Sequence, residues 1–114
     1  MDKYEYKLRA EEIIRLAGKK NYEAAAKLAY DIRWEKVKNI QMLCTVSEIY
    51  EKVGKYDESK DVLLLAYNRT PNGKMIVYRL AELSIAMKDY KEANDFYHEY
   101  IELAPGDSNA LLLK

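Results

Sequence analysis

Apolar residues along the chain recur at steps of three and four, the spacing of one face of an α-helix, in six stretches. Residues 42–53 show this most clearly. Their apolar side chains form one stripe: Met42, Leu43, Val46, Ile49, Tyr50 and Val53. Residues off the stripe, such as Glu48 and Glu51, are polar. The segment therefore predicts a helix with one buried face and one open face.

Short breaks separate or end these stretches. They fall at 18–21, 33–39, 54–55, 70–74, 88–89 and 105–107. Glycine and proline in such breaks favour turns over helix, and a proline removes a backbone donor and clashes with the preceding helical turn. The breaks therefore predict an all-α chain whose helices come in pairs.

A repeat of 34 residues underlies the pairs. Tyrosine recurs at this interval at the start of each second helix, followed three residues later by a small residue, and two prolines have the same spacing: Tyr22, Tyr56 and Tyr90; Ala25, Ser59 and Ala93; Pro71 and Pro105. A small residue lets two helices approach to the low end of about 8 to 10 Å between axes. A period of this length predicts a helical solenoid, in which each hairpin buries its apolar face on the next.

These positions, with small residues at Ser47 and Ala81, resemble the tetratricopeptide repeat (TPR) family over residues 40–107. The resemblance implies an all-α, right-handed superhelix in which the first helix of each hairpin lines a concave groove. We expect one domain over 1–114, with repeats at about 6–39, 40–73 and 74–107 and the start of a seventh helix at 108–114.

The first unit departs from the pattern. Ile13 stands where the family has a small residue, Glu12 where it has leucine, and Val37 replaces the closing proline. Either its first helix is shifted by a residue around Gly18, or its packing is specific to the end of the solenoid, as in many terminal repeats.

Composition narrows the function. The 114 residues contain 19 basic and 19 acidic side chains. The chain therefore lacks the net positive charge that favours binding to nucleic acids and anionic membranes. Its longest apolar run, VLLLAY at 62–67, is far below the roughly 20 residues of a membrane-spanning helix. The single cysteine, Cys44, forms no disulfide framework, which favours a cytoplasmic setting.

Candidate catalytic chemistry is sparse. The chain has one histidine, His98, and it has neither a glycine-rich phosphate loop nor Cys and His residues at metal-ligand spacing. We therefore predict no enzyme activity, no metal and no cofactor, with His98 a surface or half-buried helix residue. Cys44 has no cation among its sequence neighbours, which favours packing over reactivity.

The resemblance to the TPR family also implies which side chains face the groove. They are Gln41, Cys44, Thr45, Glu48, Glu51, Met75, Tyr78, Arg79, Glu82 and Ile85. Tyr78 would supply contact area and Arg79 a donor fork, while Glu48 and Glu82 favour a partner with some positive charge. The main functional hypothesis is thus a scaffold that binds a peptide or helix of a partner protein. A solvated helix face is the other interpretation of the same residues.

One family activity is not expected. The carboxylate clamp that holds the acidic C-terminal tails of chaperones uses lysine, asparagine and arginine at five groove positions. These positions correspond here to Ala10, Ile14, Thr45, Met75 and Arg79, of which only Arg79 matches. A tail with two carboxylates would lack its donors.

The segment GDSNALLLK after Pro105 predicts a further helix, capped by Asp107 or Ser108, with Leu111, Leu112 and Leu113 barely covered. Because solenoids need a polar end cap, we expect a fragment of a longer protein or an end that pairs with another copy. The alternative functions are therefore a homodimer through this helix, self-assembly within a longer solenoid, or the regulatory domain of a larger enzyme.

Overall fold

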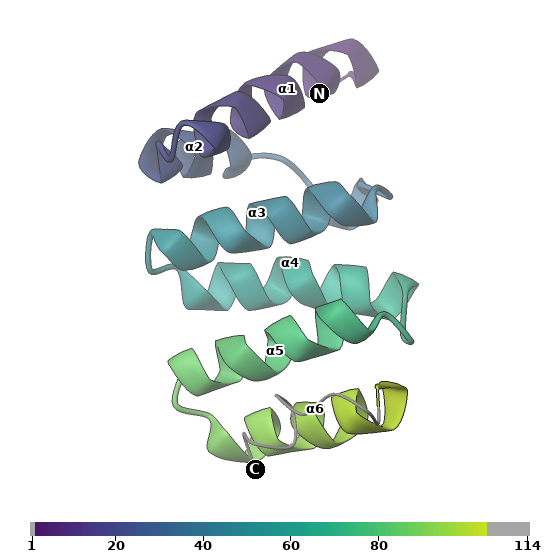
Figure 1. Ribbon diagram of the computed structural model, residues 1–114. Helices are drawn as coiled ribbons and strands as arrows, with labels where there is room; N and C mark the ends of the chain where they lie inside the picture. Colours follow the sequence, from purple (N-terminus) through teal and green to yellow (C-terminus); the bar gives the residue numbers. More distant parts are fainter. Residues whose placement is uncertain (1, 105–114) are drawn as a thin grey trace.

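The computed structural model describes residues 2–104, which form six α-helices and one short 3-10 helix and no strand (Figure 1). The helices are α1 (Lys3–Gly18), α2 (Tyr22–Ala29), α3 (Ile40–Lys52), α4 (Tyr56–Arg69), α5 (Lys74–Ala86) and α6 (Tyr90–Leu103), and the 3-10 helix is η1 (Trp34–Lys36). They stack in chain order along the longest dimension of the molecule, which measures 43 × 24 × 21 Å.

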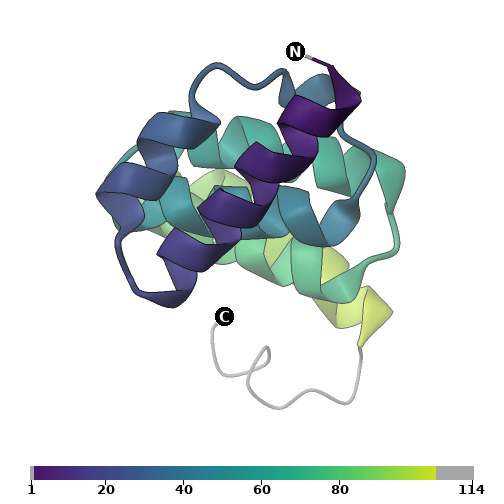
Figure 2. The same cartoon turned by 90° about the horizontal axis from the view of Figure 1, so that it is seen from above.

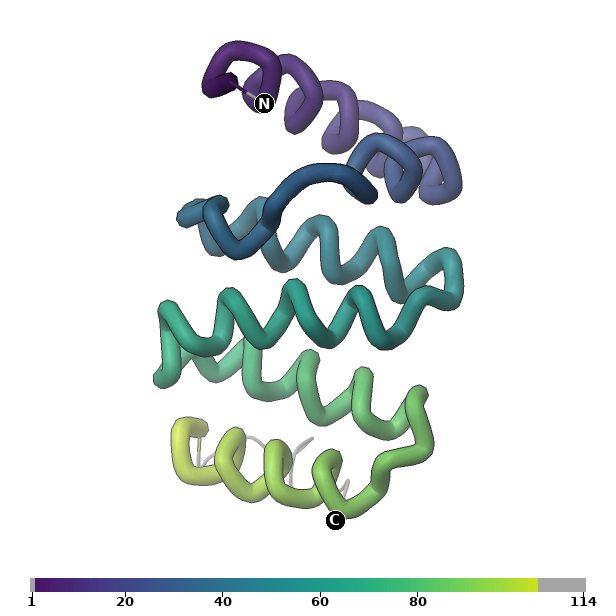
Figure 3. Tube along the Cα trace, turned by 180° about the vertical axis from the view of Figure 1, so that it is seen from behind, coloured from purple at the N-terminus to yellow at the C-terminus, as the bar shows by residue number. Residues whose placement is uncertain are grey.

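The helices pair as predicted. Helix α1 packs on α2, α3 on α4 and α5 on α6, and the hairpins join through α2 against α3 and α4 against α5 (Figures 1 and 3). Between α4 and α5 the chain turns at Pro71, Asn72 and Gly73, as expected. Each hairpin therefore buries its apolar face on its neighbour.

The turn inside every hairpin has the same register. Lys20, Gly54 and Lys88, spaced by 34 residues, have positive φ angles of 62°, 80° and 63°. Two of the following helices are capped alike, since Asn21 accepts from the amide of Ala24 at 3.4 Å and Asp89 from that of Glu92 at 3.1 Å. The first helix is therefore not shifted around Gly18, and of the two alternatives the end-specific packing is correct.

The helix crossings explain that packing. Ser47 and Ser59 meet at the crossing of the second hairpin, and Ala81 and Ala93 hold the equivalent positions, 34 residues later, in the third; all four are buried. In the first hairpin the buried Ile13 takes the place of the small residue opposite Ala25. A larger side chain at the crossing requires a wider separation of α1 from α2.

The first hairpin also ends differently. Helix α2 has 8 residues, whereas α4 and α6 have 14 each, so the predicted break at 33–39 begins earlier, at Tyr30. The connector of residues 30–39 crosses the back of the stack to α3 (Figure 3). Ile32 and Trp34 are buried while Asp31, Arg33 and Glu35 are exposed, a two-residue alternation that a helix cannot satisfy.

Two hydrogen bonds fix the connector. The indole Nε1 of Trp34 donates to the carbonyl of Ala29 at 3.0 Å, and Nη2 of Arg69 donates to the carbonyl of Glu35 at 2.6 Å. The connector is thereby tied both to the end of α2 and to α4. The predicted seventh helix, with its caps and leucines at 107–113, lies outside the described residues.

Candidate functional site

The ten residues predicted to face the groove all keep accessible surface. On α3, Gln41 and Glu48 are exposed, and on α5, Met75, Glu82 and Ile85 are exposed. The other five are half-buried: Cys44, Thr45, Glu51, Tyr78 and Arg79. The residues that alternate with them in the sequence, such as Leu43 and Leu80, are buried. The predicted side chains thus contribute to the accessible surfaces of α3 and α5, and their part in a binding groove stays a prediction.

Four of these residues are linked by electrostatic effects, since Arg79 acts on Cys44 and on Glu82, and Glu51 acts on Glu82. They are called the central cluster: Cys44, Glu51, Arg79 and Glu82. Although Glu82 keeps exposed surface, partial desolvation of its carboxyl raises its pKa, and the nearby carboxylate of Glu51 raises it further, while Arg79 lowers it. Two acids and one cation from neighbouring hairpins are therefore close enough for their charges to affect the ionisation of Glu82. In the 34-residue repeat Glu48 is the residue equivalent to Glu82. The acid that raises the pKa of Glu82 is instead Glu51, one helical turn after Glu48.

Cys44 has a cation that its sequence neighbours do not provide. Burial raises the pKa of its thiol, and Arg79 from the next hairpin partly offsets this effect. The net increase keeps the thiol protonated at neutral pH, which agrees with packing over reactivity. The 34-residue register makes Arg79 the equivalent of Thr45 and gives no signal of its effect on Cys44.

Tyr78 borders the central cluster and also packs on α6. Its ring centroid lies 6.0 Å from that of Tyr97 and 5.0 Å from that of Tyr100. Burial raises the pKa of the Tyr97 phenol, and Tyr78 and Glu82 add to the increase. Part of the Tyr78 ring is therefore used to hold α5 to α6, so the area it offers a partner is smaller than its whole face.

A cleft of about 390 Å³, here called the groove cleft, extends the open face toward the N-terminus. Its lining comes from α1, from α3 and from the residue before α3: Tyr6, Ala10, Ile14, Gln41, Met42, Thr45 and Asn39. Two predicted groove residues, Gln41 and Thr45, thus meet α1. Sequence reasoning missed Tyr6, the first residue of the irregular first repeat, and Asn39, which falls in the break at 33–39.

The chain's one histidine, His98, is exposed on α6. Within residues 2–104, no three His, Cys, Asp or Glu side chains lie close enough to hold a metal ion. In the same part of the chain no helix is both long and apolar enough to cross a membrane.

The sequence model of the tetratricopeptide repeat matches residues 40–72 and 76–107, more than half of the chain. The chain belongs to the tetratricopeptide repeat family. The two matches are the second and third hairpins, where the resemblance was expected to hold. The first hairpin, with Ile13 at its crossing and a short α2, is outside them.

Solved TPR structures share this fold. PcrH in complex with the chaperone binding region of PopB has a TM-score of 0.73 at 10% identity, covering 96% of this chain and 89% of that one. The first TPR of Spaghetti (RPAP3) bound to the HSP90 peptide SRMEEVD has a TM-score of 0.73 at 17% identity, covering 97% of this chain and 88% of that one. The second TPR domain of human RPAP3 with the HSP70 peptide SGPTIEEVD has a TM-score of 0.74 at 16% identity, covering 91% of this chain and 87% of that one. No protein of curated function matches the chain.

Proposed function

We propose that this TPR domain is a non-catalytic interaction module that binds a peptide or helix of a partner protein along the open faces of α1, α3 and α5. The observation that carries the proposal is the central cluster, in which Glu51, Arg79 and Glu82 converge from two hairpins beside the exposed Met75 and Ile85. Such a mixture of charged and apolar groups suits specific recognition. The PcrH and RPAP3 structures, which hold segments of other proteins, support this use of the fold.

The partner segment carries a basic side chain. Burial and the carboxylate of Glu51 disfavour the ionised form of Glu82. A lysine or arginine placed between the two acids would favour that form, and so gains a charge-assisted hydrogen bond. Apolar side chains next to the basic one would cover Met75 and Ile85. This refines the prediction from Glu48 and Glu82 by giving Glu51 the role of the second acid.

Acidic chaperone tails are not included in the proposal. Of the five positions of the family's carboxylate clamp, Ala10, Ile14 and Thr45 line the groove cleft and Met75 is exposed, which leaves Arg79 as their one charged donor. We further propose a cytoplasmic setting, which a single half-buried cysteine fits. The module would serve equally in a longer scaffold or as the regulatory part of a larger enzyme.

Peptide binding tests the proposal. Labelled peptides that share apolar residues and differ in charge would be titrated with the domain and followed by fluorescence anisotropy. We expect preference for a basic peptide and a loss of about fivefold in affinity for Glu51→Gln or Glu82→Gln, the equivalent of about 1 kcal/mol for a partly exposed pair. Glu48→Gln is the matched control, since Glu48 is exposed on the same face of α3 and should have little effect.

The pH dependence adds an independent readout. The pKa of Glu82 is raised in the free protein, and a bound cation would lower it, so binding releases protons. Affinity for the basic peptide should therefore fall as the pH is lowered through the Glu82 pKa, and Glu82→Gln should weaken this dependence. An affinity for the basic peptide that neither Glu51→Gln nor Glu82→Gln lowers would contradict the proposal.

A further inference from the structure

A second cleft, of about 580 Å³, lies beside the groove cleft and is called the basic cleft. It opens between the N-terminal end of α1 and the connector, which pass close to each other (Figure 2). The cleft exists because α2 stops at Ala29 and the chain turns, instead of continuing a helix as in α4 and α6. Its volume is in the range of ligand-binding pockets.

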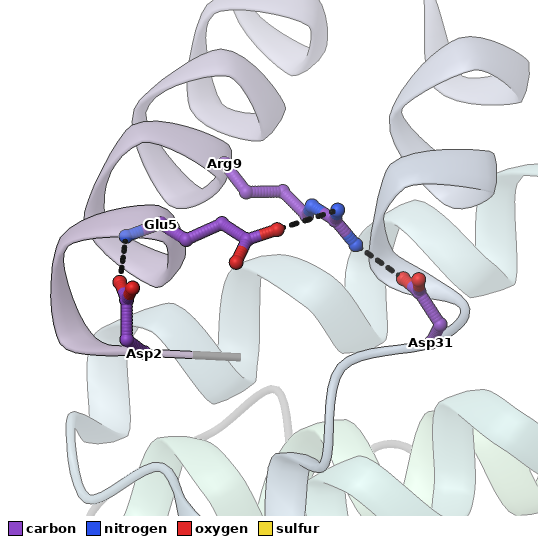
Figure 4. Close-up of polar contacts among 4 residues, drawn as sticks. All are labelled: Asp2, Glu5, Arg9 and Asp31. Carbon is purple, nitrogen blue, oxygen red and sulfur yellow. Dashed lines mark hydrogen bonds and ion pairs between the residues drawn. The ribbon is translucent and has the colours of Figure 1, made fainter.

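The acids of the basic cleft already have partners (Figure 4). Asp2 caps α1, since its Oδ1 accepts from the amide of Glu5 at 2.8 Å. Asp31 accepts from Nη1 of Arg9 at 2.5 Å, and this hydrogen bond lowers the pKa of the Asp31 carboxyl. Nη2 of Arg9 also lies 3.8 Å from Glu5. Arg9 thus compensates the charge of Asp31, while Asp2 is held by the Glu5 amide and keeps its charge.

The cations of the basic cleft have no such partners. Lys3, Arg33, Lys36 and Lys38 are all exposed, and none forms an ion pair with another residue of the 2–104 segment. Four uncompensated cations therefore surround this cleft on a chain whose total charge is zero. The local excess favours an anionic ligand.

The wall of the cleft is apolar. Ile32 and Val37 expose only 8% and 9% of their surface. Tyr6 is half-buried, and burial raises the pKa of its phenol. A bare phosphate would leave these side chains without a contact. An apolar side chain flanked by carboxylates would satisfy both the wall and the surrounding cations.

We propose that the basic cleft binds an acidic segment of a protein partner, with an apolar side chain against Tyr6, Ile32 and Val37 and its carboxylates facing Arg33 and Lys36. The basic cleft and the groove cleft share Tyr6 and Asn39 as lining residues. A polypeptide chain lying along the groove can therefore continue into the basic cleft, which favours a protein segment over a small anion. This site is separate from the central cluster.

The test uses a fluorescein-labelled peptide of sequence EDELEDE with both ends capped, so that no terminal carboxylate takes part. We expect saturable binding that weakens with salt, and a loss of about tenfold or more for Arg33→Glu with Lys36→Glu, since two charges are reversed. The matched control, Lys52→Glu with Lys74→Glu, makes the same change in net charge at exposed lysines outside the cleft and should lose much less.

Other measurements separate the outcomes. Replacing the leucine of the peptide by serine should weaken binding, and NMR shifts on the unaltered protein should centre on Tyr6, Ile32 and Val37. Glu82→Gln should leave the affinity for this acidic peptide unchanged, because Glu82 belongs to the central cluster and not to the basic cleft. The two double variants therefore test the basic cleft, and Glu82→Gln tests the groove proposal. Absence of binding, an equal loss in both double variants, or competition by inorganic phosphate as effective as by unlabelled peptide would each overturn the proposal.

Discussion

The two serines where α3 crosses α4 form a closed pair. Ser47 Oγ lies 2.9 Å from Ser59 Oγ and donates to the Ser59 carbonyl at 3.0 Å, while Ser59 Oγ donates to the Ser47 carbonyl at 2.7 Å. Both side chains are fully buried. In the third hairpin Ala81 and Ala93 take the same two places, so the crossing also packs without hydroxyls.

We predict that Ser47→Ala and Ser59→Ala each lower the free energy of unfolding by about 1 kcal/mol, because each breaks a buried hydrogen-bonded pair. The double variant should cost less than the sum, since it reproduces the alanine pair of the third hairpin. Urea denaturation and a double-mutant cycle measure this. Ser84→Ala is the control, because this buried hydroxyl donates only within its own helix, to Leu80 at 2.8 Å, and should change stability little. Full additivity would contradict the closed pair.

At the residue scale, accessibility at the ten groove residues agrees with the TPR resemblance that assigned them. Their role in a binding groove stays a prediction, because only the resemblance specifies it. The resemblance did not indicate that Glu51, and not Glu48, acts on Glu82, or that Arg79 acts on Cys44. These effects depend on the distance and angle between neighbouring hairpins, which the tertiary packing determines and a repeat period does not specify.

The turn within each hairpin uses one left-handed residue, and two of the three are lysines. A side chain at positive φ costs about 1 to 2 kcal/mol relative to glycine, partly offset by the greater freedom of glycine in the unfolded chain. Gly54 occupies the equivalent position at φ 80°, where an added Cβ would meet no atom within 4 Å. The cost at these turns therefore comes from the backbone angle and not from a clash.

We predict that Lys20→Gly and Lys88→Gly each raise the free energy of unfolding by about 0.5 to 1 kcal/mol. The reverse change, Gly54→Lys, should lower it by about the same amount. Chemical denaturation followed by circular dichroism checks all three. A gain at one lysine and a loss at the other would show that these turns are not equivalent, contrary to their shared φ angle and spacing.

At the scale of helices, the predicted end of α2 was wrong. Helical periodicity extended this helix to residue 32, but it ends at Ala29. In the connector that follows, Ile32 and Trp34 are buried and Arg33 between them is exposed. That alternation is visible in the sequence, but five residues give a weak signal beside a strong 34-residue repeat. Because the basic cleft results from this early end, it could not be predicted from the repeat.

Across the whole molecule, net neutrality conceals two regions of opposite character. The central cluster joins two acids to one cation near α3 and α5, while four cations without ion pairs in the described residues surround the basic cleft at the first hairpin. A partner segment with basic and acidic ends would fit one direction along the groove better than the other. Charge would thus set orientation, while the apolar residues supply contact area.

The hairpins should also differ in stability. In a solenoid each repeat contacts only its neighbours, so an end repeat with fewer contacts can unfold first. The first hairpin has the 8-residue α2 and exposes Tyr4, Leu8 and Ile14 on α1, at 72%, 51% and 53%. Trp34, the chain's one tryptophan, is buried in the connector, and its hydrogen bond to Ala29 at the end of α2 makes its fluorescence sensitive to unfolding of this hairpin.

We predict that in urea the Trp34 fluorescence changes at a lower midpoint than the far-ultraviolet circular dichroism, which reports on all helices. Lys20→Gly should raise the fluorescence midpoint by roughly 0.3 to 0.5 M, because a gain of under 1 kcal/mol is divided by a small unfolding slope. Lys88→Gly is the matched control: it stabilises the third hairpin and should shift the dichroism without moving the fluorescence. Coincident fluorescence and dichroism transitions in all variants would contradict this prediction and mean that the repeats unfold as one cooperative unit. The contacts between α2 and α3 would then couple the first hairpin to the rest of the molecule.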